Sequence, residues 1–158
     1  MSVRSLLMAA AGASTAPAYR YWRIYVTALN AGGSMVAIGE VELRTTAGGA
    51  DQTTSATPVL ESSYLVAEDS SYYPGANTVD EYLSSYWASS FYTSPPHSIR
   101  YDLTTQKAIV QVAIYPYPAS WHCPRDFKIQ GSNDGVNFMD VKSFTSVDAW
   151  TGWQVFNL

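Results

Sequence analysis

Residues able to do acid–base or nucleophilic chemistry are few in this chain. The only histidines are His97 and His122, and the only cysteine, Cys123, directly follows the second of them. Adjacent side chains on an extended backbone point to opposite sides, so we do not expect His122 and Cys123 to form a catalytic dyad. The sequence also has no Gly-x-Ser-x-Gly motif, phosphate-binding loop or His/Cys metal spacing.

Carboxylates are the remaining catalytic candidates. Glycosidases use a pair of them, and Glu40, Glu61, Glu68 and the aspartates leave that chemistry open. Nothing in their spacing singles out one pair. The sequence therefore predicts a protein that is not an enzyme.

The amino-acid composition limits the kinds of molecule that this chain can be expected to bind. The chain has 12 Tyr and 5 Trp among 158 residues, and aromatic side chains favour both strands and surfaces that stack on sugar rings. The net charge is −4 and the lysines form no basic cluster, which argues against nucleic-acid binding. No apolar run approaches the roughly 20 residues that a bilayer-spanning helix needs.

The chain from Tyr19 onward has the pattern of successive strands. Residues 20–29 alternate, and Trp22, Ile24 and Val26 share the apolar face that we expect to be buried. In the next strand, residues 35–44, the apolar phase shifts at Gly39, which predicts a β-bulge. Further strands are predicted at residues 97–103, 108–115 and 150–156, whereas residues 60–96 contain no helix longer than a turn or two.

A β-hairpin is predicted near the C-terminus. The alternating strand that begins at Phe127 leads into Ser132-Asn-Asp-Gly135, whose residues tolerate positive φ, and a second strand follows over residues 138–144. With no sustained helical period after the first residues, the class is all-β, and residues 19–158 form one antiparallel β-sandwich.

Several stretches resemble the discoidin-like family, the galactose-binding β-sandwich of coagulation-factor C domains. The hairpin is similar to its S-x-D-G-x-x-W/F motif, and residues 77–87 (Asn-Thr-Val-Asp-Glu-Tyr-Leu-Ser-Ser-Tyr-Trp) to its A-x-D-G-N-x-x-T-x-W segment. Residues 97–103 resemble the W-I-x-V-D-L strand, with His97 in place of Trp. Residues 21–27 and 38–44 resemble the two strands that usually close such a domain. Because they come first here, the resemblance implies a circularly permuted galactose-binding-like jelly roll.

The resemblance also implies a calcium site. In this family the Asp-to-Trp loop commonly wraps Ca²⁺ together with a Glu from the A-E-I-E strand. The corresponding ligands here are the side chains of Asp80, Ser85 and Glu40 and the carbonyls of Tyr82 and Gly39. The alternative is that Glu40 faces solvent and Asp80 only caps a turn.

The resemblance also implies a carbohydrate-binding site. Loops at one end of the sandwich bind sugars in this family, and the loop of residues 115–125 has suitable side chains. Trp121 would be the stacking platform and His122 and Arg125 the polar contacts, with further aromatic area from Tyr117, Tyr72, Tyr73 and Tyr92. Two alternatives remain. In the first, Trp121 packs on the sandwich edge while Arg125 pairs with Asp126 or a backbone carbonyl, and in the second, these aromatics form protein–protein contacts.

Residues 1–18 form a separate segment. Their apolar stretch, including Leu6, Leu7 and Met8, resembles the leaders of bacteriophage structural proteins and predicts an extended or short helical anchor into a larger assembly. The combined expectation is a multicopy virion protein of a phage tail, baseplate, fibre or capsid surface that attaches to host glycans or neighbouring subunits. The alternatives are a decoration or adaptor protein without sugar binding, and a secreted bacterial carbohydrate-binding module whose leader is a signal peptide.

Overall fold

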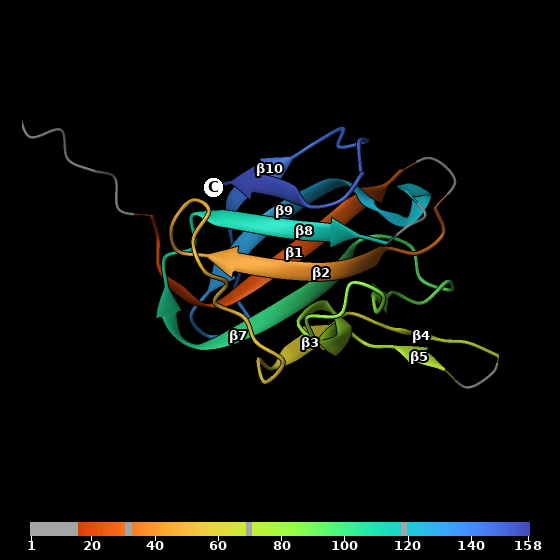
Figure 1. The fold of residues 1–158 in the computed structure, drawn as a ribbon, viewed down its shortest axis with the longest axis horizontal. Helices are drawn as coiled ribbons and strands as arrows, with labels where there is room; N and C mark the ends of the chain where they lie inside the picture. Colours follow the sequence, from red (N-terminus) through yellow and green to blue (C-terminus); the bar gives the residue numbers. More distant parts are fainter. Residues whose placement is uncertain (1–15, 31–32, 69–70, 118–119) are drawn as a thin grey trace, which may run out of the picture.

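The computed structural model describes residues 16–30, 33–68, 71–117 and 120–158, and Figure 1 shows their arrangement. Two antiparallel sheets make up the body. The five-stranded sheet has the order β10-β9-β1-β7-β3 and the four-stranded sheet the order β11-β8-β2-β6. The predicted all-β sandwich is therefore confirmed.

The first sheet is built from long strands with a short strand at one edge. In spatial order its members are β10 (Met139–Phe144), β9 (Pro124–Ser132), β1 (Tyr19–Leu29), β7 (His97–Lys107) and β3 (Val59–Glu61). The second sheet contains β11 (Gln154–Asn157), β8 (Gln111–Pro116), β2 (Ala37–Arg44) and β6 (Trp87–Ala88). The remaining elements are the hairpin β4 (Leu65–Val66) with β5 (Tyr72–Tyr73) and the 3₁₀ turns η1 (Gly75–Thr78) and η2 (Ser120–His122).

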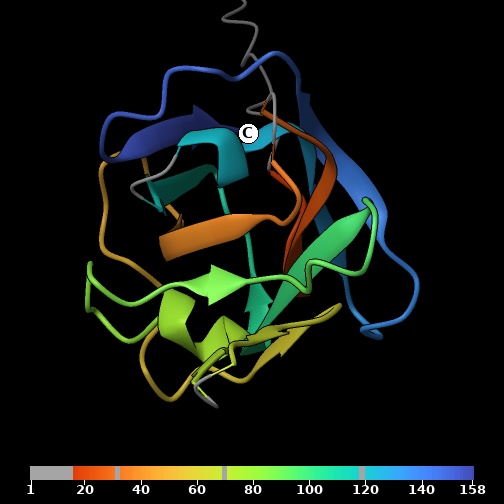
Figure 2. The ribbon, with the colours of Figure 1, turned by 90° about the vertical axis from the view of Figure 1, so that its right-hand side faces the viewer.

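The core lies between the two sheets, which face each other in the end-on view of Figure 2. The predicted face of β1 is confirmed as buried, because Trp22, Ile24 and Val26 are at most 1% exposed. Opposite them pack side chains of β2 and β8, and His97 fills a core position at the start of β7. Burial lowers the pKa of His97, so this imidazole is neutral inside the core.

The predicted bulge lies in β2. The register between β2 and β8 shifts between Ile38 and Glu40, so that Ile38 and Val41 both face the core. A Cβ on Gly39 would lie 3.2 Å from the carbonyl oxygen of Tyr115, which explains why the tightly packed bulge carries glycine.

Two strand predictions were wrong at their ends. Residues 108–110 precede β8 as irregular backbone, although Ile109 is fully buried. The final strand begins at Gln154, and Trp150 lies in the loop before it, where its indole N–H donates to the carbonyl of Pro124 at 3.0 Å. Tertiary packing thus buries Ile109 and Trp150 without strand pairing, and apolar pattern alone does not distinguish the two situations.

The segment 1–18 lies mostly outside the described residues, and so do its predicted anchor residues Leu6, Leu7 and Met8. Within the part of the chain that the structure describes, there is no helix of the length and apolarity required to cross a bilayer.

Candidate functional site

Three loops meet at one end of the sandwich. The loop after β1 contacts the loop that contains η2, because the Asn30 N–H donates to the carbonyl of Cys123 at 3.3 Å. A Cβ on Gly33 would lie 2.1 Å from the carbonyl oxygen of Trp121, so only glycine permits this approach. Figure 1 shows both loops at the right-hand end of the molecule, where the loop of residues 91–96 also lies.

A groove of about 500 Å³ opens at this end. Its lining combines aromatic and apolar side chains with hydroxyl groups and consists of Leu29, Asn30, Gly33, Ser34, Phe91, Tyr92, Thr93, Ser94 and Pro95. Tyr92 is 96% exposed and Phe91 46% exposed. The groove therefore offers flat apolar faces beside hydrogen-bonding groups, which is the composition expected of a site for a small polar ligand.

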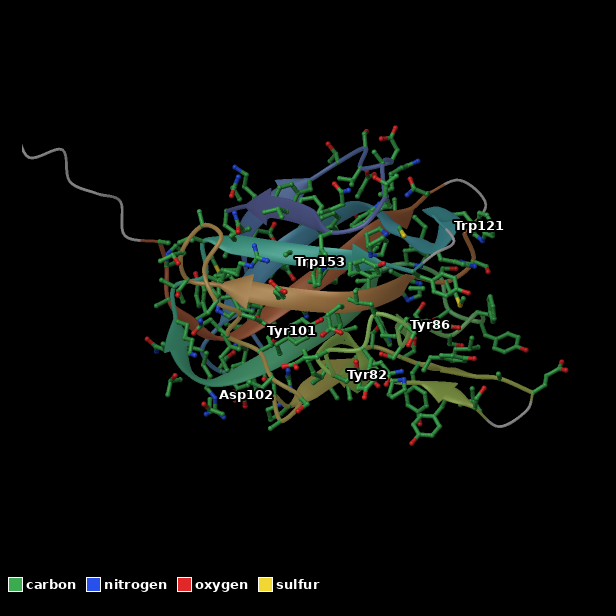
Figure 3. All side chains as sticks on the ribbon, viewed as in Figure 1. Tyr82, Tyr86, Tyr101, Asp102, Trp121 and Trp153 are labelled. Atoms are coloured by element: carbon green, nitrogen blue, oxygen red, sulfur yellow. The ribbon has the colours of Figure 1, made fainter. Side chains whose placement is uncertain are left out.

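Trp121 stands beside this groove and is 51% exposed. Figure 3 shows it at the loop end, opposite the end where Asp102 lies. Its ring contacts His122 with centroids 5.8 Å apart, and the His122 ring lies 6.0 Å from Tyr117. His122 Nδ1 is 3.3 Å from the carbonyl oxygen of Met35, which ties η2 to the start of the second sheet.

The aromatic contacts continue inward from Tyr117. Its ring lies 4.3 Å from Tyr86, which stacks on Tyr73 at 4.6 Å, and all three pack on the small buried cluster of Met35, Ala37 and Ala88. Burial, aided by hydrogen bonds to Tyr73 and Tyr117, raises the pKa of Tyr86, so its hydroxyl stays protonated. The sequence pattern had not singled out Tyr86, which lies between Tyr73 and Tyr117, two of the predicted sugar contacts.

The other predicted sugar contacts do not gather at Trp121. Tyr72 is exposed on the β4–β5 hairpin, where it contacts Tyr64 with centroids 6.3 Å apart. Arg125 lies at the start of β9 and pairs with Asp126 at 3.2 Å, as the alternative interpretation expected. The structure thus brings together Trp121, His122, Tyr117 and Tyr73, with Tyr92 on the adjoining groove.

A second group of oxygen atoms surrounds Ser85 in the loop between η1 and β6. Ser85 Oγ lies 2.8 and 2.9 Å from the two carboxylate oxygens of Asp80 and 2.7 Å from the carbonyl oxygen of Tyr82. The carbonyl oxygen of Asn77 is 3.4 Å away. A hydroxyl has one proton, so it cannot donate to all four oxygens, and the loop therefore concentrates acceptors around one point.

Glu40 lies next to this loop rather than in solvent. It is only 5% exposed, and its Oε2 is buried without a hydrogen-bond partner among the described residues. Burial, followed by the negative charge of Asp80, raises the pKa of Glu40 to about 7, while a backbone N–H from Glu81 opposes the shift. The alternative in which Glu40 faces solvent is therefore wrong. Asp80 does cap a turn, since its Oδ1 accepts the Tyr82 N–H at 2.9 Å.

This arrangement fits an oxygen-binding cation by its donor chemistry. It combines carboxylates, carbonyls and a hydroxyl, the ligand types that Ca²⁺ selects. Only two of its side chains are acidic, and no group of three or more His, Cys, Asp or Glu side chains suited to a metal occurs in the described part of the chain. Sequence reasoning missed the carbonyl of Asn77, because a backbone ligand leaves no side-chain signal.

Cys123 lacks the properties of a catalytic nucleophile. Cys123 is buried, and burial raises the pKa of its thiol to about 12, with the sulfur 3.7 Å from the carbonyl oxygen of Tyr117. Such a thiol is not a nucleophile at neutral pH.

The sequence model of an F5/F8 type C family, described as "NedA-like, galactose-binding domain", matches residues 77–158. A comparison with curated proteins gives no match. The matched residues include the oxygen-rich loop, η2 and the C-terminal hairpin, but not β1 and β2.

Proposed function

The chain belongs to the NedA-like galactose-binding family of F5/F8 type C domains, and from this premise we propose that it binds carbohydrate through the loop end that carries Trp121. Domains of this family generally bind rather than catalyse. The proposed role of the protein is accordingly attachment to a glycan without chemical conversion of it.

The observation that carries this proposal is a half-exposed indole beside a polar groove. Trp121 is half-exposed, and its backbone carbonyl lies against Gly33, which lines the groove together with Tyr92, Thr93 and Ser94. An indole face suits the apolar C–H face of a pyranose ring, while hydroxyls and backbone groups suit its polar edge. His122 is held in place beside the indole by its contact with Met35.

A glycan array with three proteins tests this function. The wild type should retain galactose-containing or related glycans, and Trp121→Ala should lose them. Trp153→Ala is the matched control, because Trp153 is 38% exposed but lines a different cavity, with Glu40 and Glu42. Absence of binding by the wild type would reject the proposal in favour of a structural adaptor role.

The order of the strands supports a circular permutation as part of this proposal. β1 lies between β7 and β9, and β2 lies between β6 and β8, so residues outside the family match fill central positions in both sheets. Ala16, Pro17 and Tyr19 line one cavity together with Leu158. The beginning and end of the sandwich thus lie side by side, as relocation of two terminal strands requires.

We also propose that Ca²⁺ stabilises the loop between η1 and β6. The carboxylates of Asp80 and Glu40, Ser85 Oγ and the carbonyls of Asn77 and Tyr82 would hold it, with the Gly39 carbonyl as a further candidate. A bound cation would supply positive charge to two carboxylates that otherwise repel each other, and would give the unpartnered Glu40 Oε2 a ligand.

The proposed setting is the surface of a bacteriophage particle, where several copies would present the loop end to host glycans. Support for this setting comes only from the leader-like sequence of residues 1–18. Mass spectrometry of the native N-terminus tests it, since a mature protein that begins after Ala18 would instead indicate a secreted module with a signal peptide.

A further inference from the structure

A row of polar side chains crosses the outer face of the five-stranded sheet. The strand registers place Leu60 opposite Arg100, Arg100 opposite Arg23, Arg23 opposite Gln130, and Gln130 opposite Asp140. Residues directly opposite in antiparallel strands share one face, with Cβ atoms about 5 Å apart. Two arginines are therefore immediate neighbours in the middle of this row.

Two positive charges directly opposite each other destabilise a sheet unless other contacts offset their repulsion. The guanidinium of Arg23 stacks on Phe138 at 3.8 Å and lies 5.0 Å from Tyr25, while that of Arg100 lies 5.3 Å from Tyr21. These aromatic contacts use the faces of the guanidinium groups. The in-plane N–H groups remain available for hydrogen bonds.

The protein uses few of those N–H groups. Arg23 donates through Nε to Gln130 at 2.8 Å, and Arg100 donates through Nη1 to the carbonyl of Gly135 at 2.9 Å. With the residues that the structure describes, neither arginine forms an ion pair, whereas Arg20 on the same sheet pairs with Asp102 at 2.7 Å. Both side chains are held firmly and still have unused donors.

One of the two nearby carboxylates is paired with other groups. Asp140 accepts from Gln130 at 2.6 Å and from Lys128 at 2.7 Å, so its charge is already paired at the far side of the row. Glu61 lines the groove beside Arg100, but its Oε2 lies 2.8 Å from where a Cβ on Gly75 would be, beside the core-facing side of β3. The groove lining therefore carries two guanidinium groups against one carboxylate, a net positive charge in a chain whose own net charge is −4.

A groove of about 180 Å³ lies at this point, and its walls supply more donors. Its lining includes Ser62 and Ser98 together with the two arginines, Val136 and Phe138. Ser62 Oγ accepts the Ser98 N–H at 3.0 Å, and its hydroxyl can also act as a donor. Hydroxyl and guanidinium donors thus converge on one small space.

We propose that this groove is an oxyanion site that binds a carboxylate or sulfate group through Arg23 and Arg100. Two fixed guanidinium edges match the geometry of a planar carboxylate or a sulfate, and bound negative charge relieves the repulsion between them. The anion can be free in solution or carried by an acidic sugar. The site lies on the sheet face and does not depend on sugar binding at the Trp121 loop end.

NMR of the arginine Nε–Hε groups in the full chain tests this inference at constant ionic strength. The titrants are sodium sulfate, sodium glucuronate and neutral glucose. Sulfate and glucuronate should shift the signals of Arg23 and Arg100, and glucose should not. Equal affinity for both anions would identify a free oxyanion as the ligand, whereas tighter binding of glucuronate would identify an acidic sugar.

Variants decide whether the arginines carry the binding. Arg100→Gln should weaken the binding of both anions about tenfold. Arg100→Lys should weaken it less, because lysine keeps the positive charge but lacks the paired N–H donors of a guanidinium group. Lys142→Gln, which removes an exposed charge on β10, should bind as the wild type does. Unchanged affinity in Arg100→Gln, no shift with either anion, or an equal response to glucose would overturn the proposal, whatever the glycan array shows for Trp121.

Discussion

Glu40 on β2 is buried beside Asp80 in the loop after η1, and burial together with the charge of Asp80 raises the pKa of Glu40 to about 7. At neutral pH a buried carboxylate near a second one is costly unless a cation is present. The six-residue turn from Asp80 to Ser85 supplies further oxygens, from Ser85 Oγ and the Tyr82 carbonyl. This relationship links the two parts of the chain that the permutation proposal brings together.

Calcium should raise the thermal stability of the protein. With Ca²⁺ at 100 times its dissociation constant, linkage predicts about 2.7 kcal/mol of stabilisation, or roughly 5–10 °C in melting temperature. Melting curves in EDTA and in Ca²⁺ measure this difference. Asp80→Asn should abolish it, and Asp148→Asn, an exposed carboxylate outside the loop, should preserve it. Identical curves in EDTA and Ca²⁺ for the wild type would reject the metal site.

The family-matched residues 77–158 should not fold by themselves. This fragment lacks β1 and β2, which occupy central positions in both sheets and contribute Trp22, Ile24 and Val41 to the core. A fragment without these strands would leave β7 and β9 without a shared neighbour. A two-dimensional NMR spectrum measures the result, and we expect narrow dispersion for residues 77–158 and wide dispersion for residues 16–158. A well-dispersed spectrum of the short fragment would contradict the account of the fold.

Much of this fold follows from sequence patterns. The alternation of β1, the glycine bulge in β2 and the Ser132–Gly135 turn are local signals, and each lies where it was predicted. Asp134 illustrates why the turn is so well specified, since its carboxylate accepts the N–H groups of Val136 and Asn137, each at 2.8 Å. These contacts, with a hydrogen bond from the Asn137 side chain, lower the pKa of Asp134.

The Asp102–Arg20 pair should stabilise the protein above acidic pH. Hydrogen bonds from Arg20 lower the pKa of Asp102, so the native state binds fewer protons than the unfolded state as pH falls below about 4. Asp102→Asn should therefore cost about 1 kcal/mol at pH 7 and much less at pH 2. Asparagine keeps an oxygen that can accept the Thr104 N–H, and it removes the charge together with one of the two hydrogen bonds from Arg20. Urea unfolding at both pH values measures the difference, and an equal cost at both would contradict this role of the pair.

The binding surfaces were less accessible to sequence reasoning. The groove at the loop end joins residues 29–30 and 33–34 to residues 91–95, segments with loop composition and no period that would place them together. The Arg23–Arg100 pair depends on the register between β1 and β7, which only the folded sheet defines. Tyr72 was assigned to the sugar site as added aromatic area and lies instead on the β4–β5 hairpin against Tyr64, while Arg125, assigned from the loop of residues 115–125, pairs with Asp126.

Chemical-shift mapping with a glycan selected on the array tests the central claim most directly. We expect the largest amide and indole shifts from residues 29–30, 33–35, 91–95 and 121–123, and we expect Trp121→Ala to remove them. Shifts confined to the outer face of the five-stranded sheet or to the β4–β5 hairpin, with the loop end unchanged, would contradict it.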